Sequence, residues 1–231
     1  MLSQRYIMFQ MTIAPDYVRQ TADDELLTYL PLCHIAERVF SAWLPLAHGA
    51  TINFAESPET VMQNLRELSP TYMFAVPRVW EKFYSRVTTA MAEATWVGRK
   101  AYDWAIRIGT LRADKITAGQ PLSAWERVRY AIADWLVFSN IKKVLGLDRT
   151  RNAASGAAPI SPALLRWFLA MDIAIDELWG QTELGIVTST RKGRFRFGTV
   201  GPAMPGTEVR IADNGEIIAR SDGQFSGYLN L

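Results

Sequence analysis

Residues 179–183 of this 231-residue chain combine side chains that can bind a nucleotide and a divalent cation. The indole ring of Trp179 can stack on a base, and Gly180 lets the backbone pass close to a ligand. After Gln181, the hydroxyl of Thr182 can contact a phosphate oxygen, and the carboxylate of Glu183 offers Mg²⁺ a hard oxygen ligand. Taken singly, Trp179 also fits a core position and Glu183 a solvated carboxylate at a helix start. The division of tasks over consecutive residues favours a nucleotide site.

Two further motifs flank this pentapeptide in the sequence. Upstream lies a run of small residues, which consists of Ser155, Gly156, Ala157, Ala158 and Pro159. Such a run is typical of a tight turn between a strand and a helix, and its small side chains also let a flat base lie against the backbone. Downstream, residues 198–206 are punctuated by glycine and proline. The two interpretations of the upstream run are compatible.

In this order and at these separations, the three motifs resemble those of the acyl-adenylate-forming (AMP-binding) superfamily, which includes acyl-CoA synthetases, luciferases and peptide-synthetase adenylation domains. The resemblance implies that Glu183 helps to hold Mg²⁺ beside the phosphates of ATP and that Thr182 contacts a phosphate. It places Trp179 beside the adenine or at the wall of the acyl pocket, although most relatives carry tyrosine there. It also implies that the main chain of residues 156–159 lines the adenine pocket.

His34 is a further candidate, at the end of a Leu-Pro-Leu-Cys-His segment. A single histidine beside an apolar helix is also compatible with a packing role. The resemblance places this position near the substrate carboxylate, where it would orient the acid and line the acyl pocket without accepting a proton.

The resemblance spans nearly the whole chain but covers only a middle portion of the family pattern. The Ser/Thr/Gly-rich phosphate loop, the aspartate that binds the ribose and the small C-terminal lid domain with its catalytic lysine have no counterpart here. Residues 1–231 are therefore expected to be part of the large N-terminal AMP-binding domain, to need the rest of that protein, and to show little or no adenylation alone.

The elements that position these residues are expected to alternate between strand and helix. A strand, a helix and a strand in so few residues predict a parallel crossover, and the Trp179 motif should follow the carboxyl end of the strand at 173–178, where open α/β sheets place ligands. Ser57 is a candidate N-cap for the helix at 58–68. The expected strands are 26–32, 51–55, 72–76 and 173–178, and the expected helices are 34–48, 58–68 and 162–170.

Between these parts, residues 78–146 have a helical pattern that is interrupted near Gly119. Apolar residues three or four apart between Trp125 and Leu145 favour a core-facing helix, with contact to anionic lipid as the alternative. Residues 207–212 and 216–219 alternate as β structure around a turn. The prediction is an α/β domain with an incomplete parallel sheet, a helical insertion and a C-terminal β portion.

Composition narrows the choice of partners and compartment. With 25 basic and 23 acidic residues and a net charge of +2, the chain lacks the broad positive field of a nucleic-acid-binding protein. Its single cysteine, Cys33, excludes an internal disulfide, and together with the absence of a signal-peptide pattern it favours the cytoplasm. No apolar run approaches the ~20 residues of a spanning helix, so membrane contact would be peripheral, at the inner face. The short basic run at 191–196 fits a solvated hairpin.

The favoured function is part of a long-chain fatty acid:CoA ligase, with ATP, Mg²⁺ and CoA as cofactors and cosubstrate and a fatty acid as the substrate. The helical insertion after the Pro-Arg-Val-Trp-Glu-Lys segment at 77–82 resembles that of long-chain fatty acyl-CoA synthetases. Two alternatives stay open: an adenylating ligase for another acid, and a non-catalytic remnant that binds a nucleotide or acyl ligand.

Overall fold

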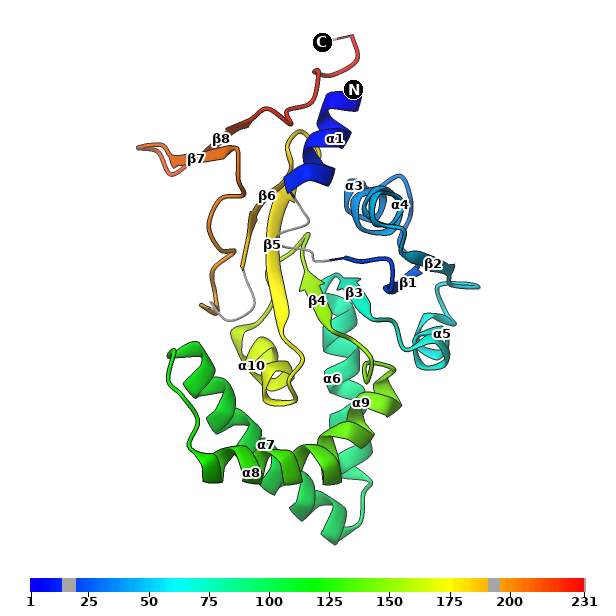
Figure 1. Ribbon diagram of the computed structural model, residues 1–231, viewed down its shortest axis with the longest axis vertical. Coiled ribbons are helices and arrows are strands. Elements are labelled where there is room, and N and C mark those ends of the chain that lie inside the picture. Colours follow the sequence, from blue (N-terminus) through cyan, green and yellow to red (C-terminus); the bar gives the residue numbers. More distant parts are fainter. Residues whose placement is uncertain (14–19, 191–195, 231) are drawn as a thin grey trace.

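A four-stranded sheet forms the centre of the molecule (Figure 1). The computed structural model describes residues 1–13, 20–190 and 196–230. In the order β3-β4-β5-β6, the first three strands are parallel and β6 is antiparallel to β5. The strands are β3 (Tyr72–Ala75), β4 (Asn152–Ser155), β5 (Ile175–Gln181) and β6 (Gly185–Ser189). The α/β class and the parallel core expected from the sequence are confirmed.

A second, two-stranded parallel sheet lies beside β3. It pairs β1 (Glu25–Thr28) with β2 (Thr51–Phe54), and the Thr71 N–H donates to the carbonyl of Glu25 at 3.0 Å. Because β1 lies between β2 and β3, the crossover through α5 (Val61–Leu68) joins strands that are not direct neighbours.

The start of α5 corrects a prediction. The N-cap residue is Thr60, whereas Ser57 lies in the preceding turn, where its carbonyl accepts a hydrogen bond from the Thr60 N–H at 3.2 Å. The proline at 58 suggests the first helical turn, but the Ser57 and Thr60 hydroxyls each accept the backbone N–H of the other residue and stabilise a turn instead.

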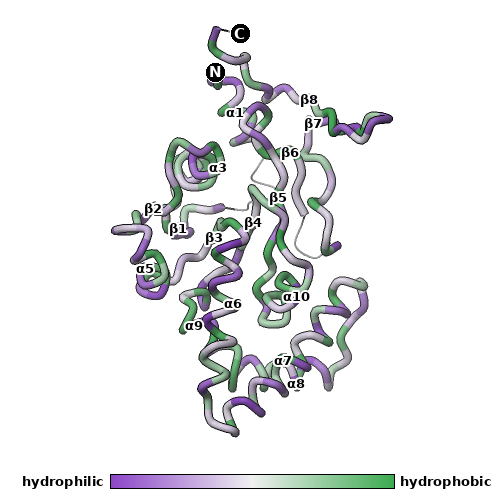
Figure 2. The backbone as a smooth tube through the Cα atoms, turned by 180° about the vertical axis from the view of Figure 1, so that it is seen from behind, coloured by the Kyte–Doolittle hydropathy of each residue, from purple (hydrophilic) through white to green (hydrophobic). Residues whose placement is uncertain are grey.

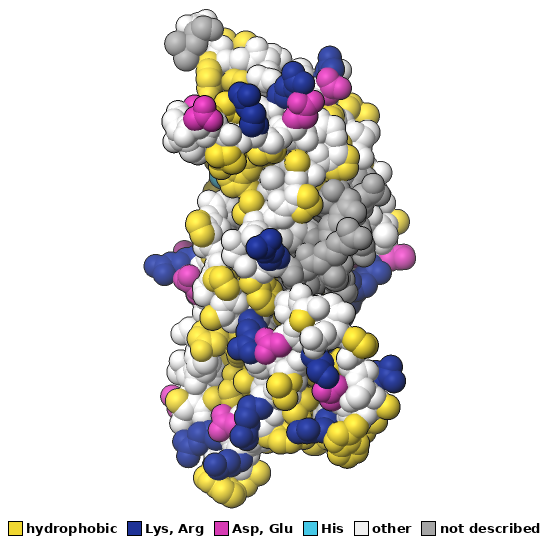
Figure 3. Space-filling model, turned by 90° about the vertical axis from the view of Figure 1, so that its left-hand side faces the viewer, with side chains coloured by type: hydrophobic (Ala, Val, Ile, Leu, Met, Phe, Trp, Pro, Cys, Tyr) yellow, Lys and Arg dark blue, Asp and Glu magenta, His cyan; other side chains and the backbone are white. Residues whose placement is uncertain are grey.

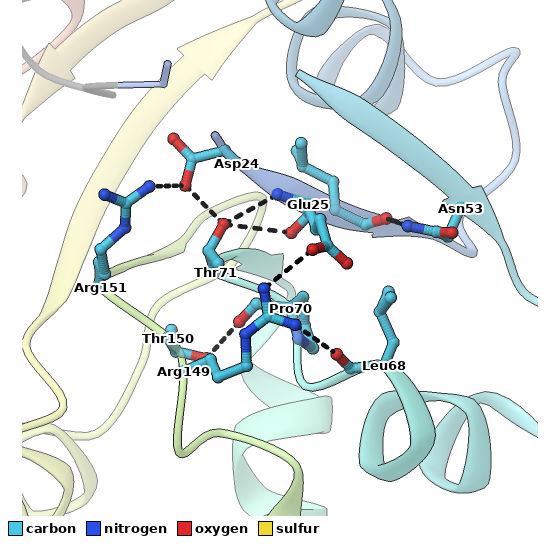
Figure 4. A network of polar contacts seen from close by, with 10 residues as sticks. Asp24, Glu25, Asn53, Leu68, Pro70, Thr71, Arg149, Thr150 and Arg151 are labelled. Carbon is cyan, nitrogen blue, oxygen red and sulfur yellow. Dashed lines mark hydrogen bonds and ion pairs between the residues drawn. The ribbon is translucent and has the colours of Figure 1, made fainter. Parts of the chain in front are cut away.

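A polar network joins the amino ends of β1, β3 and β4 (Figure 4). The carboxylate of Asp24 is fully buried and accepts hydrogen bonds from the hydroxyl of Thr71 and, at 2.8 Å, from the Arg151 guanidinium. The Thr71 hydroxyl in turn accepts the Glu25 N–H at 2.9 Å, and Arg149 pairs with the Glu25 carboxylate at 2.8 Å. These bonds fix the strands at the end opposite to their carboxyl ends.

Two helices cover one face of the central sheet, α6 (Pro77–Ala92) and α10 (Pro162–Ala170), with Trp80 stacked edge-on against Phe168 at 5.1 Å between ring centroids. Helix α7 (Trp96–Thr117) packs closely on α10 because Gly109 has no side chain. A Cβ there would lie 2.4 Å from the carbonyl oxygen of Ala170. Figure 2 shows hydrophobic residues along α10 and the central strands, which mark the main core.

The opposite face of the sheet carries α1 (Gln4–Ile13) and a three-part helix, which is α3 (Ile35–Arg38), the π-helical turn η1 (Val39–Trp43) and α4 (Leu44–His48). Phe40 of η1 stacks on Phe74 of β3, with centroids 4.3 Å apart. Gly49 ends α4 with φ of 76°, as its position after the apolar stripe predicts. A separate hairpin, β7 (Thr207–Ile211) with β8 (Ile217–Ser221), lies near the chain ends.

The helical region also includes a continuous run of α8 (Ala124–Ala133), the π-helical turn η2 (Asp134–Phe138) and α9 (Ser139–Leu145). The expectation that its apolar stripe packs in the core is wrong for the first half. Of the predicted stripe, Phe138, Ile141 and Leu145 in the second half are buried, whereas Trp125 and Trp135 are 67% and 74% exposed. The run carries apolar residues on two faces, and only one of these faces packs against the rest of the protein.

None of the helices in the described segments is long and apolar enough to cross a bilayer.

Candidate active site

A cavity of about 210 Å³ opens at the carboxyl ends of β3, β4 and β5. Its walls come from the start of α3, from η1, from the loop after β4 and from the β5–β6 hairpin. Seven of the predicted site residues border it, whereas Ala158, Pro159 and Glu183 lie just outside. The lining residues are His34, Ile35, Ala36, Val39, Phe40, Phe74, Gly156, Ala157, Leu178, Trp179, Gly180, Gln181, Thr182, Gly185 and Ile186.

The Trp-Gly-Gln-Thr-Glu motif forms the tip of the β5–β6 hairpin. The strand does not stop before Trp179 as expected, because β5 continues to Gln181 and pairs antiparallel with β6. Thr182 and Glu183 occupy the turn, so the alternative of a helix-start carboxylate is wrong. The register shifts between Trp179 and Gly180, and a Cβ on Gly180 would lie 2.0 Å from the Gly185 carbonyl oxygen. Glycine is therefore required at this close crossing.

Gln10 of α1 holds this hairpin in place, and sequence reasoning missed it. Its buried amide donates to the Leu184 carbonyl at 2.9 Å and accepts the Ile186 N–H at 3.0 Å. These two bonds satisfy backbone groups at the start of β6 that the sheet leaves unpaired. In the sequence, the signal for this contact is a glutamine within a loosely apolar helix. The residue whose carbonyl it binds, Leu184, lies 174 residues away, so no local pattern predicts the pairing.

The small-residue loop after β4 lies on the same cavity. Gly156 approaches β5 closely, since a Cβ there would lie 3.2 Å from the Leu178 carbonyl oxygen. Ala157 has φ of 68°, which turns the chain sharply before α10. Ala158 and Pro159 continue the turn and are exposed. The loop therefore presents main chain, and little side-chain bulk, to the cavity.

The carboxylate of Glu183 is held at the mouth of the site by a residue near the end of the chain. The Tyr228 hydroxyl donates to it at 2.7 Å, and this hydrogen bond lowers the pKa of the Glu183 carboxyl. The described residues contain no cluster of three His, Cys, Asp or Glu side chains that could enclose a metal. One ionised carboxylate fits Mg²⁺ that arrives with a nucleotide, because Mg²⁺ is usually held by one or two carboxylates, phosphates and water.

His34 caps α3 and faces the cavity. Its Nδ1 accepts the Ala36 N–H at 3.1 Å, so the neutral ring carries its proton on Nε2.

Glu37, which sequence reasoning also missed, supports the loop that bears His34. Its buried carboxylate accepts the N–H groups of Tyr29 and Leu30 at 3.2 and 3.4 Å, while burial raises the pKa of that carboxyl.

Glu177 is a further buried carboxylate, on β5 two residues before Trp179. Burial raises its pKa to about 7, and a hydrogen bond from the Gly198 N–H acts in the opposite direction. Within the described residues no Lys or Arg forms an ion pair with it. Glu177 thus ties the 198–206 segment to the strand that carries the site.

The sequence also predicts a solvated hairpin for the basic run at 191–196. Residues 191–195 of that run lie outside the described part of the chain.

Glu177→Gln is expected to be more stable than the parent at alkaline pH. The folded state keeps the proton up to about pH 7, whereas the unfolded state loses it near its ordinary pKa. The free energy of unfolding therefore falls as pH rises through this window, by up to about 3 kcal/mol from this group. Urea denaturation of both proteins below and above the window measures the difference. An equal difference at both pH values would refute the assignment.

Comparisons with known proteins agree with this geometry. The family model described as AMP-binding enzyme matches residues 1–229. A protein named long-chain-fatty-acid–CoA ligase ACSBG2, from Xenopus laevis, is 32% identical over 246 residues, covering 100% of this chain and 33% of that protein. One named long-chain-fatty-acid–CoA ligase heimdall, from Drosophila melanogaster, is 30% identical over 241 residues, covering 100% of this chain and 35% of that protein. This chain spans about a third of the length of these relatives.

A solved structure has the same fold. A malonyl-CoA ligase in a product complex with methylmalonyl-CoA and AMP superposes with a TM-score of 0.65 at 22% identity, covering 99% of this chain and 41% of that one. The fold class, the motif order and the family model all agree. This chain therefore belongs to the adenylate-forming, AMP-binding enzyme family that its three motifs indicated.

Proposed function

We propose that this chain is part of a ligase that activates a long-chain fatty acid with ATP and transfers the acyl group to CoA. A carboxylate oxygen attacks the α-phosphorus of ATP and pyrophosphate leaves. The CoA thiol then attacks the acyl carbonyl and AMP leaves. One observation carries the proposal: the β5–β6 hairpin, the Gly156–Ala157 turn and His34 border one cavity at the carboxyl ends of parallel strands.

The nucleotide half of the reaction is assigned to the hairpin and the small-residue loop. Main-chain atoms of residues 156–159 receive the adenine, with Trp179 and Gln181 beside it, and Gly180 lets the strand pass closely. Thr182 contacts a phosphate, and Glu183 would hold a Mg²⁺ ion that enters with ATP and offsets the phosphate charge. The support is that Gly156, Ala157 and residues 179–182 border the cavity, that Glu183 directly follows them, and that the pKa of the Glu183 carboxyl is lowered.

The acyl half is assigned to the opposite wall. Val39, Phe40 and Phe74 make this wall apolar, which suits a hydrocarbon chain. The Nε2–H of His34 is directed to the substrate carboxylate, because Nδ1 is occupied by the helix cap. His34 then orients the acid and takes no proton from it.

The described cavity lining contains His34 but no Lys or Arg. A triphosphate bound there would lack positive charge to offset its own, which is costly in a partly desolvated site. We therefore expect residues 1–231 alone to show little or no adenylation, with the compensating groups supplied by other parts of the protein.

An acid panel assayed by ATP/pyrophosphate exchange on the full-length protein tests the proposed substrate class. A long-chain saturated acid should exceed benzoate and malonate in kcat/KM by about a hundredfold, because each added methylene gains contact with an apolar wall. His34→Asn, which keeps a capping side chain, should raise KM for the acid about tenfold and leave KM for ATP unchanged. His48→Asn on α4 is the matched control.

The alternatives predict different results in that panel. A preference for benzoate or malonate would assign another acid to this ligase. No exchange with any acid, in a full-length protein that still binds ATP, would favour a non-catalytic nucleotide-binding role and would contradict the proposal.

A further inference from the structure

The exposed side of the α8–η2–α9 helix forms an apolar and basic surface that the proposed reaction does not use. We call it the insertion face and define it by its apolar and basic side chains. These are Trp125, Val128, Ile132, Trp135, Leu136 and Val144, with the exposed Arg127 and Lys143 and, at the edge toward α7, the half-buried Arg129. The six apolar residues are between 42% and 74% exposed. From Trp125 to Trp135 the apolar residues recur three or four positions apart, so these four share one side of the helix.

The two acidic residues of this helix are turned toward partners and leave the insertion face positive. Glu126 closes a capping box with Ser123 and also binds Lys115 at 2.6 Å, which lowers its pKa to about 2. Asp134 pairs with Lys142 at 2.8 Å. By contrast, Arg127, Arg129 and Lys143 form no ion pair within the described part of the chain. The free charge on this side is therefore cationic.

The opposite side of the same helix anchors it firmly to the fold. Phe138, Ile141 and Leu145 are buried in the main core, and α8 packs along α7. The insertion face is thus presented on a rigid element. It lies at the lower end of the molecule, far from the hairpin that borders the cavity (Figure 1). In the side view, hydrophobic side chains at this end are interspersed with Lys and Arg and also with Asp and Glu (Figure 3).

We propose that the insertion face docks the protein on the surface of a bilayer that contains anionic lipid. Tryptophan prefers the boundary between headgroups and acyl chains, where its ring is buried and its N–H stays hydrated. A helix with an apolar stripe flanked by Arg and Lys lies in the plane of that boundary, and its cations attract anionic headgroups. A protein partner of acidic chemistry would not need two exposed indoles beside a continuous aliphatic stripe.

Flotation of the full-length protein with vesicles tests this inference. Vesicles of phosphatidylcholine mixed with phosphatidylglycerol should carry the protein, whereas vesicles of phosphatidylcholine alone should bind it about tenfold more weakly. Raising the salt concentration should reduce binding to the anionic vesicles. This salt response is read on the unmutated protein and does not depend on whether a variant folds.

Two variants separate the apolar and the electrostatic parts. Trp125→Ser with Trp135→Ser, and Arg127→Glu with Lys143→Glu, should each lower the bound fraction about tenfold and leave the thermal midpoint unchanged, because the side chains are exposed. The matched controls are Leu46→Ser, on an exposed site of α4, and Arg66→Glu on α5, which should bind as the parent does.

Three results would overturn the inference. One is an unmutated full-length protein that does not float with anionic vesicles, as expected if other parts of its own chain cover the face. Another is equal loss of binding in the control variants. The third is a dimer in solution that the tryptophan variants dissociate, since the face would then join two copies of the chain.

Discussion

Glu183→Gln is expected to lower kcat/KM for ATP by about a hundredfold or more in the full-length enzyme, the size of effect seen when a group that offsets developing charge is removed. Glutamine has the shape of the carboxylate and can still accept the Tyr228 hydroxyl, so the hairpin should keep its position. What it loses is the negative charge that binds Mg²⁺. ATP/pyrophosphate exchange at saturating acid measures the effect.

Two matched variants make that result specific. Glu216→Gln removes an exposed carboxylate in the β7–β8 turn and should leave exchange unchanged. Tyr228→Phe keeps the Glu183 charge and removes only the hydrogen bond that lowers its pKa, so exchange should fall by no more than a few-fold. Full activity of Glu183→Gln would mean that Glu183 serves only the turn, where its carbonyl accepts the Phe225 N–H.

Gly180→Ala should damage both stability and activity. The added Cβ would lie 2.0 Å from the Gly185 carbonyl oxygen and 3.2 Å from the Ile186 Cα, so β5 and β6 must move apart. Overpacking of this kind costs about 2 to 3 kcal/mol of unfolding free energy. A shift of the hairpin by about 1 Å would also misplace Thr182 and Glu183, with about a hundredfold loss of kcat/KM.

Urea denaturation and pyrophosphate exchange measure these two effects separately. Gly98→Ala is the control, because Gly98 lies in α7 and an added Cβ would meet its nearest atom, the Thr95 hydroxyl, at 3.4 Å. That variant should be neutral or slightly more stable, since alanine favours a helix over glycine. A Gly180→Ala protein as stable and active as Gly98→Ala would contradict the close crossing described for the hairpin.

Local pattern is sufficient to predict the elements whose neighbours are close in sequence. Helix α10 has the predicted bounds because Pro162 starts it and its apolar residues face one core. Strand β3 has four buried residues and sits within one residue of its predicted end. The β7–β8 turn also agrees, because Asp213 to Gly215 are turn residues with little alternative.

The differences come from contacts that no short window contains. Strand β5 extends through Trp179 because β6 pairs with it, and this pairing depends on Gly180 and on the Gln10 amide from the start of the chain. Helical periodicity identifies an apolar stripe that includes Trp125 and Trp135 and so predicts both in the core. Periodicity does not show whether that stripe faces the rest of the protein, and both side chains are exposed. The candidate site was located by motif, whereas its supports, Gln10, Glu37 and Tyr228, required coordinates.

A crystal structure of the full-length protein with a non-hydrolysable fatty acyl-adenylate analogue tests the central claim most directly. We predict that the adenine lies against the main chain of Gly156 and Ala157 with Trp179 in van der Waals contact, and that the acyl chain runs along Phe40 and Phe74. An analogue bound away from this cavity, or a β5–β6 hairpin turned away from the loop after β4, would contradict the account.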